Sequence, residues 1–476
     1  MDNAPARAPH IVVVGGGISG LAAAHRLLAS GARVTVLEGS AVLGGKLLAG
    51  EIEGAPVDLG AESMLARRPE GVELARAVGL GDRIQAPAAA GAAIWTRGAL
   101  RPMPTGHVMG VPARPDTLHG ILSAEGLARV AQDRELPTTE LGEDIGVGEF
   151  VAKRVGREVV DRLVEPLLGG VYAGDAYRIS MRAAVPQLFE AARTHPSLLE
   201  GVQDIQAAAA AKQRGGPVFA GLDGGIGTLP LAVADAVRAQ GGEIRTETPV
   251  LALTRTADGW RIRTDSELID ADGVILSTPA WSASALLAAE SPVAAAELSE
   301  VEYASMVLVT LAFRRADLAG LETRSGFLVP PVDGRTIKAS TFSTHKWSWV
   351  NERGSDLFVL RTSIGRYGEE RHLDWDDTDL VDVSLGDLGE AVGLSAKPVA
   401  SRVNRWIGGL PQYPVGHLAK VARVRAEVAK LPGLRVCGAA YDGVGIPACV
   451  ASARRAADEI IATSTLARNT QSDAGQ

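Results

Sequence analysis

The stretch His10–Glu38 constrains what this chain can fold into more than any other part of it. Residues 11–14 are apolar and β-branched, which predicts a buried parallel strand. The glycines that follow have the G-x-G-x-x-G spacing: Gly15, Gly17 and Gly20. Residues 21–28 then predict an alanine-rich helix, and residues 33–37 predict a second strand that leads into an acidic residue. Strand, glycine turn, helix, strand and acid in this order indicate a dinucleotide-binding unit rather than a purely structural turn.

Each conspicuous residue of this unit has a physical task. Gly15 makes the tight turn, Gly17 lets backbone approach a pyrophosphate, and Gly20 lets the helix pack close to the strand. The helix N-terminus offers free N–H groups and the positive end of its dipole to the phosphates. Glu38, 23 residues after Gly15, can accept hydrogen bonds from both ribose hydroxyls. Its charge would repel a 2′-phosphate, so NADP is disfavoured.

A second glycine pair, Gly44–Gly45, follows the ribose acid and precedes Lys46. The segment DLGAES, residues 58–63, comes soon after it. Taken alone, the pair would more simply be loop glycines. Combined with the first motif, it favours FAD over NAD, because a longer flavin dinucleotide needs more backbone donors along its length.

Composition bounds the class of protein. The chain has 476 residues, of which 46% are apolar, so it is long enough for two to four domains with large cores. Its net charge is −8 and it has no basic run, which argues against nucleic acid as a partner. The histidines and the two cysteines, Cys437 and Cys449, have no metal-ligand spacing, so no metal site is expected. Two cysteines in so long a chain suggest a reducing compartment, and we expect a cytoplasmic protein with no transmembrane segment.

The rest of the chain divides by pattern. Residues 116–213 are mostly helical in periodicity, whereas residues 300–415 alternate strand and helix patterns typical of a mixed α+β domain. A second strand–glycine turn–helix unit begins at Leu434, and its helix is predicted over residues 448–461. The polar segment 464–476 predicts a disordered tail.

Several motifs together resemble one flavoprotein family, the protoporphyrinogen/coproporphyrinogen oxidases of the FAD-dependent amine-oxidase superfamily. The distinctive segments are LRPMPTGHVMGVP, LVEPLLGGVYAGD, RWIGGLPQYPVGH and YDGVGIPACVASARRAADEI. The resemblance covers nearly the whole chain and looks closest to the bacterial branch that acts on coproporphyrinogen III. The superfamily's usual Gly-Asp after the last strand is here Gly438-Ala439, with the acid delayed to Asp442. The porphyrinogen oxidases have the same kind of turn.

The resemblance implies an α/β fold, in which a Rossmann-like FAD-binding domain is interleaved with a mixed α+β substrate domain and a helical insertion. The implied FAD-binding pieces are residues 1–60, 215–290 and 429–463. The implied substrate domain takes residues 61–95 and 291–428, the helical insertion residues 96–214, and the disordered tail residues 464–476.

The flavin contacts implied by the resemblance fall on the following residues: Gly15, Gly16, Gly17, Ile18, Ser19, Gly20, Glu38, Gly39, Lys46, Gly60, Ala61, Glu62, Ser63, Val250, Trp406, Val444, Gly445 and Ile446. On its own, Trp406 would more often be a core tryptophan. Val250 would be an ordinary strand valine, apart from the backbone amide and carbonyl that it could offer the adenine.

The implied activity is oxidation of a porphyrinogen to a porphyrin in haem biosynthesis, with dioxygen as the electron acceptor. In the family's chemistry a meso CH₂ bridge gives hydride to the flavin and a pyrrole loses its N–H proton, three times over. Because the cofactor carries the difficult step, no catalytic side chain is assigned.

The substrate carries propionates, so its pocket needs cations. Arg67 or Arg68 is the first candidate, because the family places a basic residue at this corner. Lys346 is a weaker candidate. The simpler alternatives are a solvated helix start for the two arginines and an exposed position for the lysine. A shielded charge-assisted pair contributes about 1.5–3 kcal/mol, and coproporphyrinogen has two more propionates than protoporphyrinogen.

Other functions stay open at this point: a protoporphyrinogen IX oxidase, another flavin amine oxidase or desaturase, and a non-catalytic tetrapyrrole carrier that retains FAD. The sequence also leaves open the oligomeric state, peripheral membrane contact and direct transfer of the product to a haem-pathway enzyme.

Overall fold

A five-stranded parallel sheet is assembled from three distant parts of the chain in the computed structural model, which describes residues 7–89, 91–212, 217–318, 320–354 and 356–473. Its strand order is β12-β2-β1-β16-β22. The strands are β1 (His10–Val14), β2 (Arg33–Leu37), β12 (Glu243–Arg245), β16 (Gly273–Leu276) and β22 (Leu434–Val436). All neighbouring pairs are parallel. The apolar, β-branched composition of these strands follows from burial on both faces.

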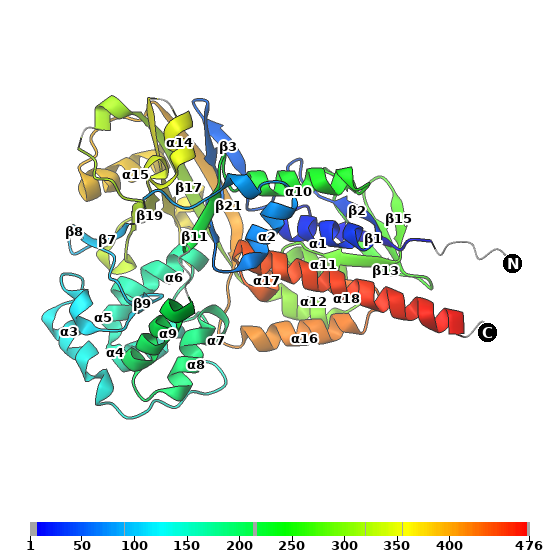
Figure 1. Ribbon diagram of the computed structural model, residues 1–476, viewed down its shortest axis with the longest axis horizontal. Helices are drawn as coiled ribbons and strands as arrows, with labels where there is room; N and C mark the ends of the chain where they lie inside the picture. Colours follow the sequence, from blue (N-terminus) through cyan, green and yellow to red (C-terminus); the bar gives the residue numbers. More distant parts are fainter. Residues whose placement is uncertain (1–6, 90, 213–216, 319, 355, 474–476) are drawn as a thin grey trace.

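Helices cover both faces of this sheet (Figure 1). On one face lie α1 (Ile18–Ala29), α10 (Thr228–Ala239) and α18 (Ile446–Asp473). The other face is covered by the antiparallel strands β13 (Ala252–Arg255), β14 (Trp260–Arg263) and β15 (Leu268–Ala271), and by the helices α11 (Ala280–Leu287), α12 (Pro292–Ser299) and α16 (His417–Ala429).

The second large sheet has seven strands in the order β21-β17-β20-β19-β18-β7-β8. They are β7 (Ala92–Thr96), β8 (Ala99–Pro102), β17 (Tyr303–Arg314), β18 (Gly326–Leu328), β19 (Ile337–Thr341), β20 (Leu357–Ile364) and β21 (Ala400–Pro411). Helix α15 (Asp377–Val392) packs on one face of this sheet through Leu380 and Leu388. Side chains on the opposite face, such as Leu308 and Leu328, are only partly buried.

The helical insertion lies beside this sheet, at the end of the molecule remote from the parallel sheet (Figure 1). Its helices are α3 (Ala124–Ala131), α4 (Val147–Val155), α5 (Arg157–Val159), the π-helical turn η4 (Val160–Val164), α6 (Glu165–Tyr172), α7 (Met181–Ala184), α8 (Pro186–Thr194) and α9 (Leu198–Lys212). A continuous core joins these helices to the short hairpin of β9 (His107–Val108) and β10 (Val111–Pro112).

Short elements connect the larger units. These are β3 (Ala49–Ile52), β4 (Ala55–Asp58), β5 (Met64–Leu65), α2 (Pro69–Ala77), η1 (Gly81–Arg83), β6 (Ile84–Gln85), η2 (Pro115–Leu118), η3 (Gln132–Arg134), β11 (Phe219–Leu222), η5 (Arg315–Leu318), η6 (Pro331–Asp333), α13 (Ser343–Lys346), α14 (Ser348–Arg353), η7 (Glu370–Asp374) and α17 (Ala439–Asp442). Strands β5, β11 and β6 form a small antiparallel sheet.

The predicted α/β class, with a Rossmann-like domain, a mixed domain and a helical insertion, is confirmed, but the packing departs from several predicted boundaries. Residues 96–102 continue a hairpin of the seven-stranded sheet, so the predicted start of the insertion cuts that hairpin. Helices α12 and α16 pack in the core of the parallel-sheet domain rather than in the substrate domain. Helix α2 likewise packs against α18, through Leu74 and Ala75. Hydrophobic packing, rather than chain order, decides these assignments.

The C-terminal segment also differs from its prediction. Residues 464–473, expected to be disordered, continue helix α18 to Asp473. This span contains no glycine or proline, and extending an existing helix costs far less than starting one. Residues 474–476 lie outside the described part of the chain.

Candidate functional site

The first glycine turn has the shape that a pyrophosphate requires. Gly15 adopts φ +106°, which favours glycine, and its N–H donates to the carbonyl of Leu37 (2.8 Å). A Cβ on Gly20 would overlap the carbonyl oxygen of Gly15, so this residue permits the close helix–strand packing. A Cβ on Gly17, in contrast, would meet nothing nearer than the Cα of Gly45 (3.9 Å). The space in front of Gly17 is therefore open at the start of α1.

The side chains of Ile18 and Ser19 are buried, so only their backbone N–H groups face this opening at the helix N-terminus. Gly17 is the N-cap residue, and no side chain of the described residues caps the helix there. The free N–H groups thus remain available to an anion.

Glu38 is fixed at the carboxyl end of β2. Its two oxygens accept from the N–H groups of Gly16 (2.7 Å) and Ser40 (2.8 Å). A carboxylate has about four acceptor sites, so capacity for ribose hydroxyls remains. The backbone carbonyl of Glu38 accepts from Thr248 N–H (2.9 Å), and Gly39 faces Pro249. The structure therefore brings the segment that leads into Val250 beside Glu38 and Gly39.

The second glycine pair lies directly against the first turn. Gly44 N–H donates to the carbonyl of Gly16 (2.9 Å), and Gly44 forms a bridge with Gly17. The pair is therefore part of the same cradle and not an unrelated loop. The Lys46 ammonium lies 5.5 Å above the Trp406 ring, and desolvation lowers the pKa of this lysine.

The loop of residues 60–63 is held by both large domains. Ala61 N–H donates to the carbonyl of Lys46 (3.0 Å), and the Trp406 indole N–H donates to the carbonyl of Leu59 (3.0 Å). From the seven-stranded sheet, Arg361 donates to the carbonyls of Asp58 (3.0 Å) and Gly60 (2.9 Å). Trp406 is thus a partly buried hydrogen-bond donor to this loop and not a core tryptophan.

Asp58 anchors the start of the same loop. Its carboxylate is buried and accepts from the N–H groups of Ile226 (2.9 Å) and Gly227 (2.8 Å). Burial raises the pKa of Asp58 to about 6, against the lowering effect of these two hydrogen bonds.

Glu62 points into a buried charge cluster. Its carboxylate lies 2.5 Å from Arg361 Nη2 and 3.7 Å from Lys346 Nζ, and it accepts from the Trp347 indole N–H. Burial alone would raise the pKa of Glu62, but Arg361 and Lys346 hold it below its ordinary value. Its side chain therefore ties the loop to the seven-stranded sheet.

Lys346 differs from the exposed lysine considered above. Its side chain is largely buried, its charge is paired with Glu62, and its ammonium lies 5.3 Å from the Trp347 ring. This pairing disfavours Lys346 as the clamp for a propionate.

Arg67 and Arg68 are exposed at the corner between β5 and α2. Arg68 is the N-cap residue of α2 and pairs with Glu70 (2.8 Å). This corner adjoins the start of α18. Burial raises the pKa of the Cys449 thiol to about 11, and the charge of Arg68 acts in the opposite direction.

The C-terminal glycine turn is the fourth backbone loop of the candidate site. Ile446 opens α18 and is buried in the core with α1, whereas Val444 packs against the core of the helical insertion. The delayed acid, Asp442, pairs with Arg425 (2.5 Å) and also accepts from Ser452 and Arg455. Burial would raise the pKa of Asp442, but these donors hold it below its ordinary value. Asp442 therefore fixes the turn rather than facing Gly445.

Two residues beside the first glycine turn, Ser277 and Thr278, were not predicted from the sequence as part of the site. Ser277 donates to the carbonyls of Val14 (2.9 Å) and Gly15 (3.0 Å) and so braces the first glycine turn. Thr278 Oγ1 is buried and has no partner among the described residues. Both follow β16. Because ligands of parallel α/β sheets lie at the carboxyl ends of strands, this position could have identified them as site residues from the sequence.

A partly exposed row of side chains crosses the seven-stranded sheet on the face opposite α15. Register places Leu308 beside Ser363, Ser363 beside Ala339, and Ala339 beside Leu328. Helix α6 faces this row, since a Cβ on Gly170 would lie 3.7 Å from Leu328 Cδ2. Three of these four side chains are apolar and none is charged, which suits a large organic ring. It lies on the same face of β20 as Arg361, the residue that binds the loop 58–62.

The described residues contain no group of three or more His, Cys, Asp or Glu side chains placed to hold a metal ion. Within those same ranges, no helix is both long and apolar enough to cross a membrane.

Comparison with known proteins agrees with this geometry. Residues 18–461 match the model of the flavin-containing amine oxidoreductases. The coproporphyrinogen III oxidase of Mycobacterium tuberculosis is 38% identical over 94% of this chain and 96% of its own length. The protoporphyrinogen oxidase of Bos taurus is 30% identical over 95% of this chain and 98% of its own length. A crystal structure from Exiguobacterium, 33% identical, covers 96% of this chain and 99% of that chain with a TM-score of 0.84.

Full-length matches of this kind establish family and cofactor: the cofactor is FAD, and the chain belongs to the coproporphyrinogen and protoporphyrinogen oxidases within the flavin-containing amine oxidoreductases.

Proposed function

We propose that this chain oxidises coproporphyrinogen III to coproporphyrin III in haem biosynthesis, with dioxygen as the electron acceptor. The relative with the higher identity of the two is a coproporphyrinogen III oxidase. A cytoplasmic location is part of the proposal, because both cysteines are buried free thiols, as is usual in a reducing compartment.

One observation carries the proposal: four backbone loops from distant parts of the chain converge along the carboxyl edge of the parallel sheet. The first glycine turn and the second glycine pair are hydrogen-bonded to each other, and the loop at Ala61 is bonded to Lys46. The open space at Gly17, the fixed carboxylate of Glu38 and the unpartnered Thr278 hydroxyl all suit an extended dinucleotide. The residues expected above to contact FAD, from Gly15 to Ile446, are proposed as its binding site.

The proposed porphyrinogen surface is the largely apolar row Leu308–Ser363–Ala339–Leu328 opposite Gly170 of α6. When bound, FAD supplies the two-electron oxidation of a meso carbon. The role of the chain is to hold the tetrapyrrole flat against this row and to exclude water from it. Arg361 and Glu62 join the row to the FAD loop, so they fix the distance between substrate and cofactor.

Arg67 and Arg68 are proposed to bind propionates at the mouth of the site. Arg68 is half-exposed, and within the described ranges its ion pair is with one carboxylate, that of Glu70, which leaves guanidinium donors for a second. Lys346 is proposed only as a minor contributor, because Glu62 already compensates its charge.

Protoporphyrinogen IX oxidation is the second candidate, since the bovine relative carries that name. Anaerobic mixing with each porphyrinogen tests the proposal. Rapid bleaching of the bound flavin by coproporphyrinogen III is the expected result. Bleaching only by protoporphyrinogen IX would favour the second candidate, and a flavin that neither compound bleaches would favour a carrier that retains FAD without catalysis.

A further inference from the structure

The paired strands β5 and β11 carry apolar side chains on both faces. Register places Met64 opposite Ala220 and Leu65 opposite Phe219. Met64 and Ala220 are buried in the core that contains α1 and α18. Leu65 and Phe219 lie on the other face and are 40% and 45% exposed. Such a face usually carries polar residues when water covers it, so two large apolar side chains side by side indicate a surface for an apolar partner.

This face of β11 is directed toward the domain of the seven-stranded sheet. Gly221 lies two residues after Phe219 and therefore on the same face of the strand. A Cβ on Gly221 would lie 2.6 Å from the Trp347 ring, so the indole covers β11 at that point. Trp347 is buried with Val359 of β20, and its indole N–H donates to Glu62. Leu65 and Phe219 thus lie next to the place where the loop 60–63 meets the seven-stranded sheet.

Leu65 also lies between the two groups that the proposed function requires. Ser63, the last residue of the loop proposed to contact FAD, precedes it by two positions, and Arg67 follows it by two. Four residue steps span at most about 14 Å even in a fully extended chain. A substrate that reaches both the FAD loop and the arginine corner therefore passes over Leu65 and its cross-strand partner Phe219.

We propose that Leu65 and Phe219 support one pyrrole ring of the porphyrinogen, the ring whose propionate binds at the corner of Arg67 and Arg68. The protein here sets an apolar pair beside two cations, which complements a propionate carried on an apolar ring. This inference rests on the proposed porphyrinogen oxidation and adds a contact to it. Because coproporphyrinogen III and protoporphyrinogen IX both have rings that carry a propionate, the contact should serve both compounds.

Fluorescence titration of the purified flavoprotein with coproporphyrin III, and separately with protoporphyrin IX, tests this contact. Phe219→Thr keeps a residue that favours strands but removes most of the apolar surface. It is expected to weaken the binding of both porphyrins about fivefold or more, because less apolar surface is buried. Phe219→Leu retains an apolar side chain and should bind both within about twofold of the wild type. Neither change should alter the thermal midpoint much, since Phe219 is exposed.

Leu268→Thr is the matched control, because Leu268 is a strand leucine that is 59% exposed on β15, in a different sheet. This variant should bind both porphyrins like the wild type. Unchanged affinity in Phe219→Thr, a loss confined to one of the two porphyrins, or a wild type that binds neither would each overturn the inference.

Two further results separate the remaining explanations. If light scattering showed a wild-type dimer that Phe219→Thr dissociates without a change in porphyrin affinity, the pair would belong to a contact between copies of this chain, and the inference would be overturned. Failure of the proposed function gives a different result: the wild type would bind the porphyrins, and Phe219→Thr would weaken that binding, but neither porphyrinogen would be converted to a porphyrin in air. That result would leave the contact with the ring supported.

Discussion

Two glycines of the first turn, Gly17 and Gly20, are under different steric constraints. Gly20 is required by the protein itself, since a Cβ would overlap the Gly15 carbonyl. Gly17 is not: its φ of −73° is open to any residue, and the space in front of it is free. We therefore propose that the need for glycine at Gly17 arises from the dinucleotide.

Gly17→Ala should accordingly keep the fold and lose cofactor. We expect an unchanged thermal midpoint of the flavin-free protein and FAD affinity reduced by at least about tenfold, or about 1.4 kcal/mol. Flavin fluorescence on titration measures the affinity. Gly386→Ala is the control, because it adds a methyl to open space within α15. If Gly17→Ala bound FAD like the wild type, Gly17 would not line the pyrophosphate site.

Arg68→Ala should raise the KM for coproporphyrinogen III roughly threefold to tenfold, with kcat nearly unchanged. The effect is moderate because Arg68 is 45% exposed and solvent screens its pairs. The KM for protoporphyrinogen IX should change less, since that substrate has two fewer propionates. Arg76→Ala, on the exposed side of the same helix, is the control. An unchanged KM in Arg68→Ala would remove this residue from substrate binding.

At the residue scale, the sequence predicted what depends on neighbours in the chain. The tight turn at Gly15 and the close helix–strand packing at Gly20 follow from their spacing within one βαβ unit. The partners of Glu62 could not be predicted, because Arg361 and Trp347 lie almost 300 residues away and reach it only through packing of the two sheets.

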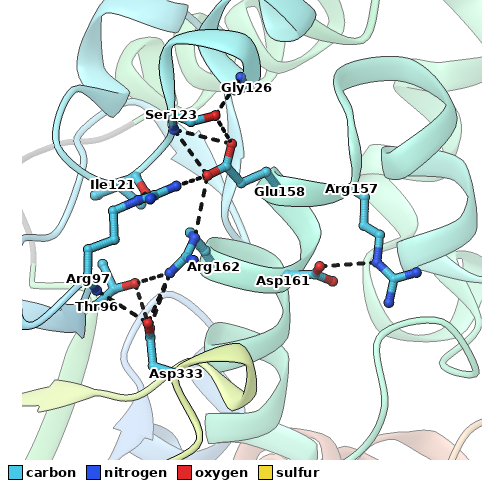
Figure 2. Close-up of polar contacts among 10 residues, drawn as sticks. All are labelled: Thr96, Arg97, Ile121, Ser123, Gly126, Arg157, Glu158, Asp161, Arg162 and Asp333. Atoms are coloured by element: carbon cyan, nitrogen blue, oxygen red, sulfur yellow. Dashed lines mark hydrogen bonds and ion pairs between the residues drawn. The ribbon is translucent and has the colours of Figure 1, made fainter.

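At the scale of elements, a polar network docks the helical insertion on the seven-stranded sheet (Figure 2). Arg162, on the π-helical turn, donates to Thr96 Oγ1 (2.6 Å) and pairs with Asp333 (3.1 Å). Glu158 accepts from Ser123 N–H (3.0 Å) and pairs with Arg97. The network thus joins the β7–β8 turn, η6 and the insertion, and α6 follows directly after the π-helical turn that carries Arg162.

Arg162→Met should loosen this docking. Its side chain is 14% exposed and faces Asp333 and Glu158, so its loss should lower the free energy of unfolding by about 1–3 kcal/mol and speed hydrogen exchange over residues 123–164. Arg157→Met is the matched control: Figure 2 shows Arg157 directed away from the network, and it pairs only with Asp161 in that view. Equal exchange in the two variants would contradict this role.

Domain boundaries could be predicted only approximately, for a physical reason. Periodicity identifies helices and strands, but the sheet or core that an element joins depends on contacts distant in sequence. Helix α12 follows the predicted end of the FAD-binding piece and still packs against the parallel sheet through Ala294 and Leu298. Hairpin β7–β8 similarly belongs with strands that come more than 200 residues later.

At the scale of the whole molecule, buried titratable groups make stability depend on pH. Burial lowers the pKa of His417 to about 4, so the folded protein keeps this imidazole neutral while the unfolded chain protonates it below about pH 6.5. The unfolded state then binds more protons, and stability falls as the pH drops through this window. Asp58 and Glu165, whose pKa values burial raises to about 6 and about 7, act in the opposite direction.

His417→Phe should therefore lose less stability than the wild type on acidification. The ring stack on Tyr413 is kept, and the carboxylate contributions cancel between the two proteins. Between pH 7 and pH 5 the difference in free energy of unfolding should shift by about 2 kcal/mol in favour of the variant. Urea titrations at both pH values measure it, with His119→Gln at an exposed histidine as the control. Parallel curves for His417→Phe and wild type would contradict a neutral buried imidazole.

We expect this chain to place a porphyrinogen against FAD and to prefer coproporphyrinogen III. The most direct measurement supplies the purified flavoprotein in air with coproporphyrinogen III and, separately, with protoporphyrinogen IX, and follows porphyrin fluorescence. We expect formation of coproporphyrin III with the higher kcat/KM. A preference for protoporphyrinogen IX would contradict the proposed substrate, and no porphyrin from either compound despite bound FAD would contradict the proposed activity itself.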